Sequence, residues 1–98
     1  MFRARLYRTE RDVLVAAADE ELIGRTLPFG KAEVAISAGF YGNETVSESD
    51  LTDMLRSCTV ANLMGTRTVG LARRLGLVMD GNVLDLAGVP HAQMARMR

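Results

Sequence analysis

The sequence is poor in several residue types that mark particular classes of protein. Its 98 residues include one cysteine, one histidine, two prolines and no tryptophan. A lone cysteine cannot form an internal disulfide, so the chain lacks the staples of small secreted domains and a cytoplasmic location is expected. Two tyrosines and three phenylalanines are the only aromatic residues. Aliphatic side chains and the six methionines must therefore fill one core.

Net charge and long apolar runs are also missing. Twelve basic side chains balance twelve acidic ones, so no overall field attracts nucleic acid or a membrane, and any such binding must be local. The longest apolar run, Val13 to Ala18, is far shorter than the roughly 20 residues of a membrane-spanning helix. It is also shorter than a signal-peptide core and leads into acidic residues. We expect no membrane association.

Charge nevertheless comes in blocks, and arginine outnumbers lysine by eleven to one. Residues 1–11 hold four arginines and one glutamate, and residues 12–21 hold four carboxylates. Residues 44–53 hold four more carboxylates, and residues 56–74 hold four arginines. Arginine suits planar contacts to carboxylate or phosphate. Pairing between the blocks is the favoured interpretation, and an anionic partner is the alternative.

Hydrophobic periodicity predicts four strands. Residues 2–8 alternate apolar and polar side chains, and residues 13–18 are continuously apolar, which is typical of a strand buried on both faces. These two segments predict a hairpin. Residues 31–37 and 82–88 predict two further strands, and residues 39–44 predict a loop.

The pattern changes to a helical period from Ser47, the predicted N-cap of a helix with apolar residues at 51, 54, 55 and 58. We expect this helix to continue through residues 60–64 and to end or bend at Gly65. A second helix is expected from Thr66 to Gly76. A helical turn is expected at residues 19–24.

These elements predict a single α+β domain over residues 1–98. The expected fold is a small, mainly antiparallel sheet of about four strands with two helices packed on one face. The other face would be left to water, a partner or a second copy.

The only histidine, His91, follows Pro90, whose fixed φ stiffens the chain. Pro90 at the first position of a short helix over residues 90–98 would place His91 in the first turn, where a neutral imidazole is favoured. Such a group could act as a general base, although a histidine that bridges to backbone is the favoured alternative. No metal-binding spacing is present, so a metal would need distant carboxylates, and we expect neither metal nor cofactor.

Two further residues have competing roles. Cys58 could be a nucleophile with His91 as its general base. Its place on an apolar helix face instead favours the role of a small core residue. Asn62 could cap the turn at Gly65, the commoner role, or face a site.

The aromatic residues suggest a binding surface. Phe40 and Tyr41 lie between glycines, and Arg3, Arg5 and Tyr7 share the first strand. These rings could stack on unpaired bases while the guanidinium groups meet phosphate. As an alternative, Phe40 anchors its loop in the core and Tyr41 covers the rim. No phosphate loop or known RNA-binding motif is present.

Five segments in order, "LVAAADEELIGRTL", "FYG", "TVANLMG", "LGLV" and "GVPHAQ", resemble the archaeal family called domain of unknown function 424. The resemblance covers residues 5–93 and implies a small, single-domain archaeal cytoplasmic protein without an assigned activity. The matching positions are Asp19, Glu20, Gly24, Phe40, Tyr41, Gly42, Ala61, Asn62, Gly65, Pro90, His91 and Gln93.

Three functional hypotheses follow. The first is a non-catalytic module that holds RNA or a protein of the translation apparatus. Its predicted binding residues are Tyr41, Asn62, His91, Gln93, Arg3 and Arg5. The second is a hydrolase or transferase with His91 as general base and Asp19, Glu20 or Glu44 as acid or metal ligand. The third is a homo-oligomeric structural subunit, for example a homodimer.

Overall fold

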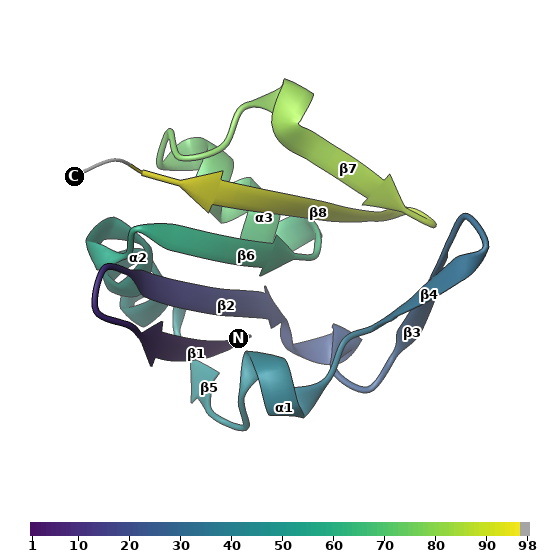
Figure 1. The fold of residues 1–98 in the computed structure, drawn as a ribbon, viewed down its shortest axis with the longest axis horizontal. Coiled ribbons are helices and arrows are strands. Elements are labelled where there is room, and N and C mark those ends of the chain that lie inside the picture. Colours follow the sequence, from purple (N-terminus) through teal and green to yellow (C-terminus); the bar gives the residue numbers. More distant parts are fainter. Residues whose placement is uncertain (97–98) are drawn as a thin grey trace.

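A computed structural model describes residues 1–96. Its main sheet has six strands and a separate hairpin has two, so the fold is α+β as predicted, although the sheet is larger than the four strands expected (Figure 1). The main sheet runs in the order β5 (Thr45–Val46), β1 (Phe2–Arg8), β2 (Val13–Asp19), β6 (Val60–Met64), β8 (Val89–Ala95) and β7 (Val83–Leu86). Its pairs are antiparallel except β2 with β6, which are parallel.

The predicted hairpin at the amino end is confirmed. Strands β1 and β2 pair from Phe2 opposite Asp19 to Arg8 opposite Val13. The alternation of β1 and the apolar run of β2 produce it, and Val15 through Asp19 are buried as a strand covered on both faces should be.

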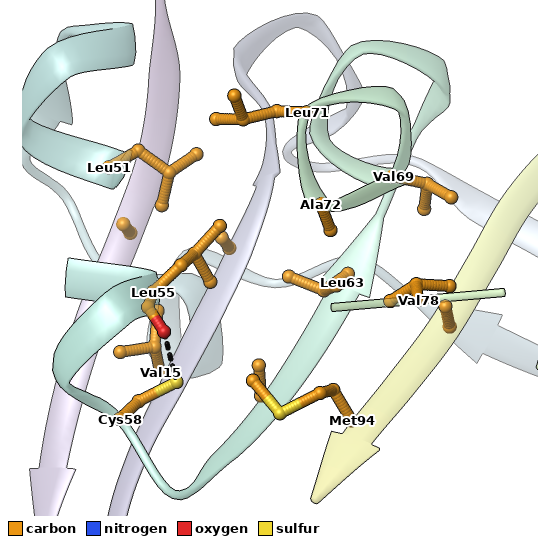
Figure 2. Packing of buried hydrophobic residues seen from close by; sticks show 14 of the residues in the cluster. Val15, Leu51, Leu55, Cys58, Leu63, Val69, Leu71, Ala72, Val78 and Met94 are labelled. Carbon is orange, nitrogen blue, oxygen red and sulfur yellow. Dashed lines mark hydrogen bonds between the residues drawn. The ribbon is translucent and has the colours of Figure 1, made fainter. Parts of the chain in front are cut away.

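Two helices, α2 (Glu48–Ser57) and α3 (Thr66–Arg74), cover one face of the main sheet (Figure 1). Ser47 is the predicted N-cap, and its hydroxyl accepts a hydrogen bond from Asp50 N at 3.1 Å. The helices pack Leu55 and Ala72 toward Val15 and Leu63 of the sheet (Figure 2). No helix among residues 1–96 has the length and apolar character to cross a lipid bilayer.

The first predicted helix is wrong beyond residue 57, because residues 60–64 form the central strand β6. Cys58 is already extended, with φ −84° and ψ 161°. The chain is then drawn into the sheet at Thr59, whose N–H donates to Val13 O at 2.8 Å and whose Oγ1 accepts from Val13 N at 2.9 Å. The β-branched residues Thr59 and Val60 favour this extended conformation.

The predicted carboxyl-terminal helix is also wrong in its described part. Residues 89–95 form β8, which pairs with both β6 and β7. Pro90 has no N–H, but its carbonyl accepts from Gly65 N at 2.8 Å, so the proline is accommodated at the start of the strand. Residues 97–98 of the predicted helix lie outside the described residues.

The second face of the sheet is partly covered by a hairpin and a short helix. The predicted strand at residues 31–37 forms one arm of this hairpin and is not part of the main sheet, whereas the helix lies at the start of a predicted loop. Residues 26–29 form β3 (Thr26–Phe29), which pairs with β4 (Ala32–Ala35), and α1 (Ala38–Tyr41) replaces the start of the predicted loop at 39–44. The predicted turn after β2 is a 3-10 helix, η1 (Glu20–Leu22), and a second one, η2 (Asp80–Asn82), precedes β7. A separate apolar cluster fills this side, including Leu22, Leu27, Ile36, Tyr41 and Met64.

Candidate binding site

Strand register gathers the predicted binding residues on the sheet face opposite α2 and α3, which we call the open face. Arg5 pairs with Ala16, Ala16 with Asn62, and Asn62 with Gln93, so one row crosses four strands. His91 lies in the next row, opposite Met64. Directly paired residues point to the same side of a sheet, so residues from distant parts of the chain share this surface.

The strands contribute no carboxylate to the open face. Its strand positions are Arg3, Arg5, Tyr7, Leu14, Ala16, Ala18, Thr45, Val60, Asn62, Met64, Leu84, Leu86, Val89, His91, Gln93 and Ala95. Two arginines are the only charged side chains in this set. Glu20 lies 3.7 Å from Arg3, so Arg5 is the arginine of this set without a carboxylate within salt-bridge distance among residues 1–96.

A cavity of about 350 Å³ lies where the β3–β4 hairpin and α1 meet the open face, and we call it the hairpin pocket. Residues lining it include Phe29, Phe40, Tyr41, Asn62, Leu84 and His91. Phe29, Phe40 and Leu84 are exposed by 50%, 38% and 54%, so much of the pocket rim is apolar. An apolar cavity with a few polar groups is the usual form of a small-ligand site.

Tyr41 and Asn62 form the polar floor of the hairpin pocket. Tyr41 Oη donates to Asn62 Oδ1 at 2.9 Å. Burial raises the pKa of Tyr41 to about 12, so its hydroxyl keeps its proton at neutral pH. This bond orients the Asn62 carboxamide, whose nitrogen makes no hydrogen bond within residues 1–96 and is available to a ligand.

His91 contributes an acceptor to the same pocket. Its Nδ1 lies 2.9 Å from the carbonyl oxygen of Leu63. A carbonyl can only accept, so Nδ1 donates to it, and in the tautomer with this single proton Nε2 is an acceptor. The favoured interpretation, a histidine that bridges to backbone, therefore describes Nδ1, while Nε2 makes no hydrogen bond among residues 1–96 and can bind a ligand.

The predicted arginines hold α1 in place. Arg5 Nη1 donates to Gly39 O at 3.1 Å, and Arg3 Nη1 donates to Gly42 O at 3.3 Å. The Arg5 guanidinium also lies 5.0 Å from the centre of the Tyr7 ring. Arg5 remains exposed and can still meet an anion, whereas Arg3 is half-buried and lies 3.7 Å from Glu20 Oε1.

The aromatic residues form a connected wall beside the pocket. Tyr7 and Phe40 stack with ring centroids 5.8 Å apart, and Phe40 meets Tyr41 edge to face at 4.9 Å. The Tyr7 hydroxyl donates to Phe40 O at 2.6 Å. Phe40 thus lies on the surface and not in the core, while Tyr41 is buried and not at the rim.

The structure does not bring the predicted acid partners to His91. Asp19 lies on the helix side of the sheet, where its carboxylate accepts from Arg67 N at 3.1 Å and from Thr68 N and Oγ1 at 2.8 and 2.7 Å. It therefore caps α3. Glu20 accepts from Thr45 Oγ1 at 3.0 Å.

Two other residues weighed with His91 lie elsewhere. Glu44 lines a separate cavity along the outer edge of β1. Cys58 is buried in the helix-side core, and its thiol donates to Leu55 O at 3.2 Å (Figure 2). Among residues 1–96, no three His, Cys, Asp or Glu side chains gather as a metal site would need.

Pairing between the charge blocks, the favoured interpretation of their order, is present. Arg3 meets Glu20, Arg74 meets Glu48 at 3.2 Å, and Arg67 forms an ion pair with Glu21. These contacts occupy Arg3 of the open face and Arg67 and Arg74 of the helix side, and they leave Arg5 without a carboxylate within salt-bridge distance among residues 1–96.

Sequence reasoning missed the contributions of Phe29, Asn82 and Leu84. Leu84 faces His91 across β7 and β8, and Asn82 immediately precedes β7. The alternation of residues 83–86 carried the signal for Leu84, because positions 84 and 86 fall on one face of a strand, whereas Asn82 belongs to η2. Phe29 had no such signal, since "LPFG" is typical of a chain break.

Comparisons with known proteins agree with this fold. The chain is similar in structure to an uncharacterized conserved protein from Methanopyrus kandleri, with a TM-score of 0.84, 22% sequence identity, and coverage of 99% of this chain and 94% of that one. No curated protein sequence matches. The model of a family described as "Protein of unknown function (DUF424)" matches residues 7–97, in agreement with the resemblance seen in the sequence motifs. The chain therefore belongs to the DUF424 family.

Proposed function

We propose that this protein is a non-catalytic RNA-binding module that holds an unpaired base in the hairpin pocket. One observation carries the proposal. The Asn62 amide nitrogen and His91 Nε2, neither of which has a hydrogen-bond partner among residues 1–96, belong to residues that line the same aromatic-rimmed cavity. Unpaired bases are recognised in this way, by stacking and by hydrogen bonds to their edges.

The geometry supports recognition of a base edge. Asn62 and His91 are diagonal neighbours on adjacent strands, with Cα atoms about 7–8 Å apart. The Asn62 nitrogen donates and His91 Nε2 accepts, so the two groups match an acceptor and a donor on one planar ring. Phe40 supplies an exposed aromatic surface for stacking.

The charge distribution supports a modest role for phosphate. Arg5 is exposed beside α1, on a face whose strands carry no carboxylate. One or two phosphate contacts would give a slope of log affinity against log salt of roughly −0.7 to −1.4. The balanced net charge agrees with such a shallow dependence.

Binding is favoured over catalysis because His91 lacks a reaction partner in its pocket. A general base needs a second group, such as an acid or an activated nucleophile, within hydrogen-bond reach of the substrate. The residues lining the two cavities beside His91 include no aspartate, glutamate or cysteine. The predicted partner Asp19 lies on the other side of the sheet.

Fluorescence anisotropy with a labelled single-stranded RNA of mixed sequence tests the proposal. Phe40→Ala is expected to weaken binding by about 1–3 kcal/mol, the range for one lost base stack. Arg5→Ala should weaken binding and flatten the salt dependence. Arg73→Ala is the matched control, because Arg73 is an exposed arginine on α3, on the opposite side of the sheet.

Equal affinity of the wild type, His91→Ala, Asn62→Ala and Phe40→Ala for this RNA would refute the proposal. Co-sedimentation with ribosomal particles, with and without His91→Ala, extends the test to the translation apparatus. If the protein binds an unpaired segment of ribosomal RNA, His91→Ala should reduce the amount of protein that sediments with the particles.

A second candidate function, a homo-oligomeric subunit, is favoured by the exposure of Phe29 and Leu84 at the pocket rim. Contiguous exposed apolar surface is typical of an interface between proteins. Sedimentation equilibrium separates the two candidate functions. A dimer whose interface includes this rim should dissociate when Phe29→Asp or Leu84→Asp is introduced. A wild-type protein that is monomeric would refute the homo-oligomeric function.

A further inference from the structure

A second cavity adjoins the hairpin pocket on the open face. It measures about 420 Å³ and is lined by Asn82, Leu84, His91, Ala92 and Gln93, and we call it the amide groove. His91 and Leu84 line both cavities, so the imidazole ring stands between them. A ligand that leaves the hairpin pocket past His91 enters the amide groove.

The amide groove continues a row of carboxamides across three strands. Asn62 on β6 pairs with Gln93 on β8. Asn82, the last residue of η2, directly precedes Val83, which pairs with Ala92, and Asn82 lines the same cavity as Gln93. Three carboxamides thus lie in order from β6 to the start of β7, and Gln93 and Asn82 are both exposed.

The chemistry of this row selects a neutral polar ligand. A carboxamide offers both donors and an acceptor, which can match the edge of any base. The groove lining contains no arginine, lysine or carboxylate, so neither a phosphate nor a metal ion finds a charged partner there. Leu84, 54% exposed, provides an apolar surface on which a ring can lie.

We infer that the amide groove is a second base subsite, which takes the nucleotide next to the one in the hairpin pocket. This inference rests on the proposed function. Asn62 lies on β6 and Asn82 directly precedes β7, and these two strands are two strand spacings, roughly 10 Å, apart. Stacked bases are only about 3.4 Å apart. The two bases are therefore unstacked, and they lie on either side of His91.

The experiment compares two RNA probes of equal length and charge. The first probe is abasic at every position except one, and the second carries two adjacent bases. The wild-type protein is expected to bind the two-base probe more tightly by roughly tenfold or more. Gln93→Ala with Asn82→Ala should remove this gain and leave the affinity for the one-base probe unchanged.

Controls separate the subsite from the rest of the face. Asn43→Ala removes an exposed carboxamide outside both cavities and should keep the gain. His91→Ala should weaken binding of both probes, since His91 lines both cavities. Thermal unfolding of the Gln93 and Asn82 double variant should match the wild type, because both residues are exposed and outside the apolar clusters.

The outcomes distinguish the inference from the proposed function. If both probes bind equally, and His91→Ala and Asn62→Ala weaken both, the hairpin pocket stands and the second subsite is overturned. If the Gln93 and Asn82 double variant weakens both probes to the same extent, the second subsite is likewise overturned. If neither probe nor a fully base-bearing RNA binds, the proposed function fails and the second subsite fails with it.

Discussion

Substituting Gly65 should displace Asp19 from the start of α3. Gly65 has φ +111° and ψ 156°, a region that residues with a side chain rarely adopt. A Cβ atom at this position would lie 2.6 Å from Asp19 Oδ2 and 2.7 Å from Oδ1. Asp19 Cγ would lie closer still, and ordinary contact begins at 3.4 Å, so the carboxylate would have to withdraw by more than about 0.8 Å. Its hydrogen bonds to Arg67 and Thr68, now 2.7–3.1 Å long, would then be lost or badly stretched.

The cost of Gly65→Ala has two parts. Backbone strain contributes about 1–3 kcal/mol. Loss of a charged cap with three hydrogen bonds contributes about 2–3 kcal/mol, by the magnitudes known for N-caps and for hydrogen bonds to ionised groups. Asp19→Ala should lower the free energy of unfolding by about the second contribution alone, the loss of the cap. For a chain of this length, each kcal/mol lowers the melting temperature by about 4–8 °C.

A double-mutant cycle tests this reasoning. Urea unfolding followed by circular dichroism gives the free energy of unfolding of the wild type, Gly65→Ala, Asp19→Ala and the double variant. Once Asp19 is truncated, the added Cβ meets no carboxylate, so Gly65→Ala should then cost only the strain. The two single losses together should therefore exceed the loss in the double variant by the cap contribution, about 2–3 kcal/mol.

Gly76→Ala provides a control, since Gly76 also has a positive φ, +75°, but no atom lies within 4 Å of its Cβ position. Its effect should be the same with or without Asp19. Additive losses for Gly65→Ala and Asp19→Ala would refute the reasoning, because they would show that the glycine is required for its backbone conformation alone.

Three further predictions concern single side chains. Because burial raises the pKa of Tyr41 from 10.0 to about 12, part of the free energy of unfolding should be lost as the pH rises through this window. Urea unfolding at pH 9 to 12 checks this, and Tyr41→Phe should show less of the loss. Burial also raises the pKa of the Cys58 thiol, which is 1% exposed, so a thiol reagent should label it only as fast as the protein opens. Labelling that is insensitive to urea would contradict this. Ser47→Ala should destabilise the protein by about 1 kcal/mol through loss of the α2 cap, whereas Ser49→Ala in the first turn should be near neutral in the same unfolding assay.

The strands with a clear period were predictable, and the segments whose conformation depends on a distant partner were not. The alternation from Phe2 and the apolar run from Val13 specify β1 and β2 locally. In contrast, apolar and polar residues do not alternate strictly in "VANLM", because Leu63 is buried on one face of the strand and Met64 on the other. Its extended form depends on Thr59 bonding to Val13, across 46 positions of the chain. That contact cannot be derived from a local pattern.

The candidate site was predictable in its residue types but not in its assembly. His91 and Asn62 were selected as polar residues next to turns, and both turned out to be strand residues. Gln93 joins them only because β8 pairs with β6 in one register, and a shift of one residue would send its side chain to the helix side. Asp19 was predicted as an acid or metal ligand that would reach His91 from a distant part of the sequence. The parallel pairing of β2 with β6 instead places it beside Gly65 and α3.

The two faces of the same strands therefore serve different purposes. On the helix side, Val15, Leu63 and Ala92 alternate with residues of the open face and pack beneath α2 and α3. On the open face, Ala16 and Ala18 are fully buried although they are small, because α1 and the β3–β4 hairpin lie directly over them. These alanines allow the covering elements to approach one end of the sheet closely. Beyond the covered end lie Asn62, Gln93 and His91, supported by the core beneath them but not part of it. Binding and stability should accordingly be separable, with substitutions at Gln93 acting on ligand affinity and substitutions at Leu63 acting on folding.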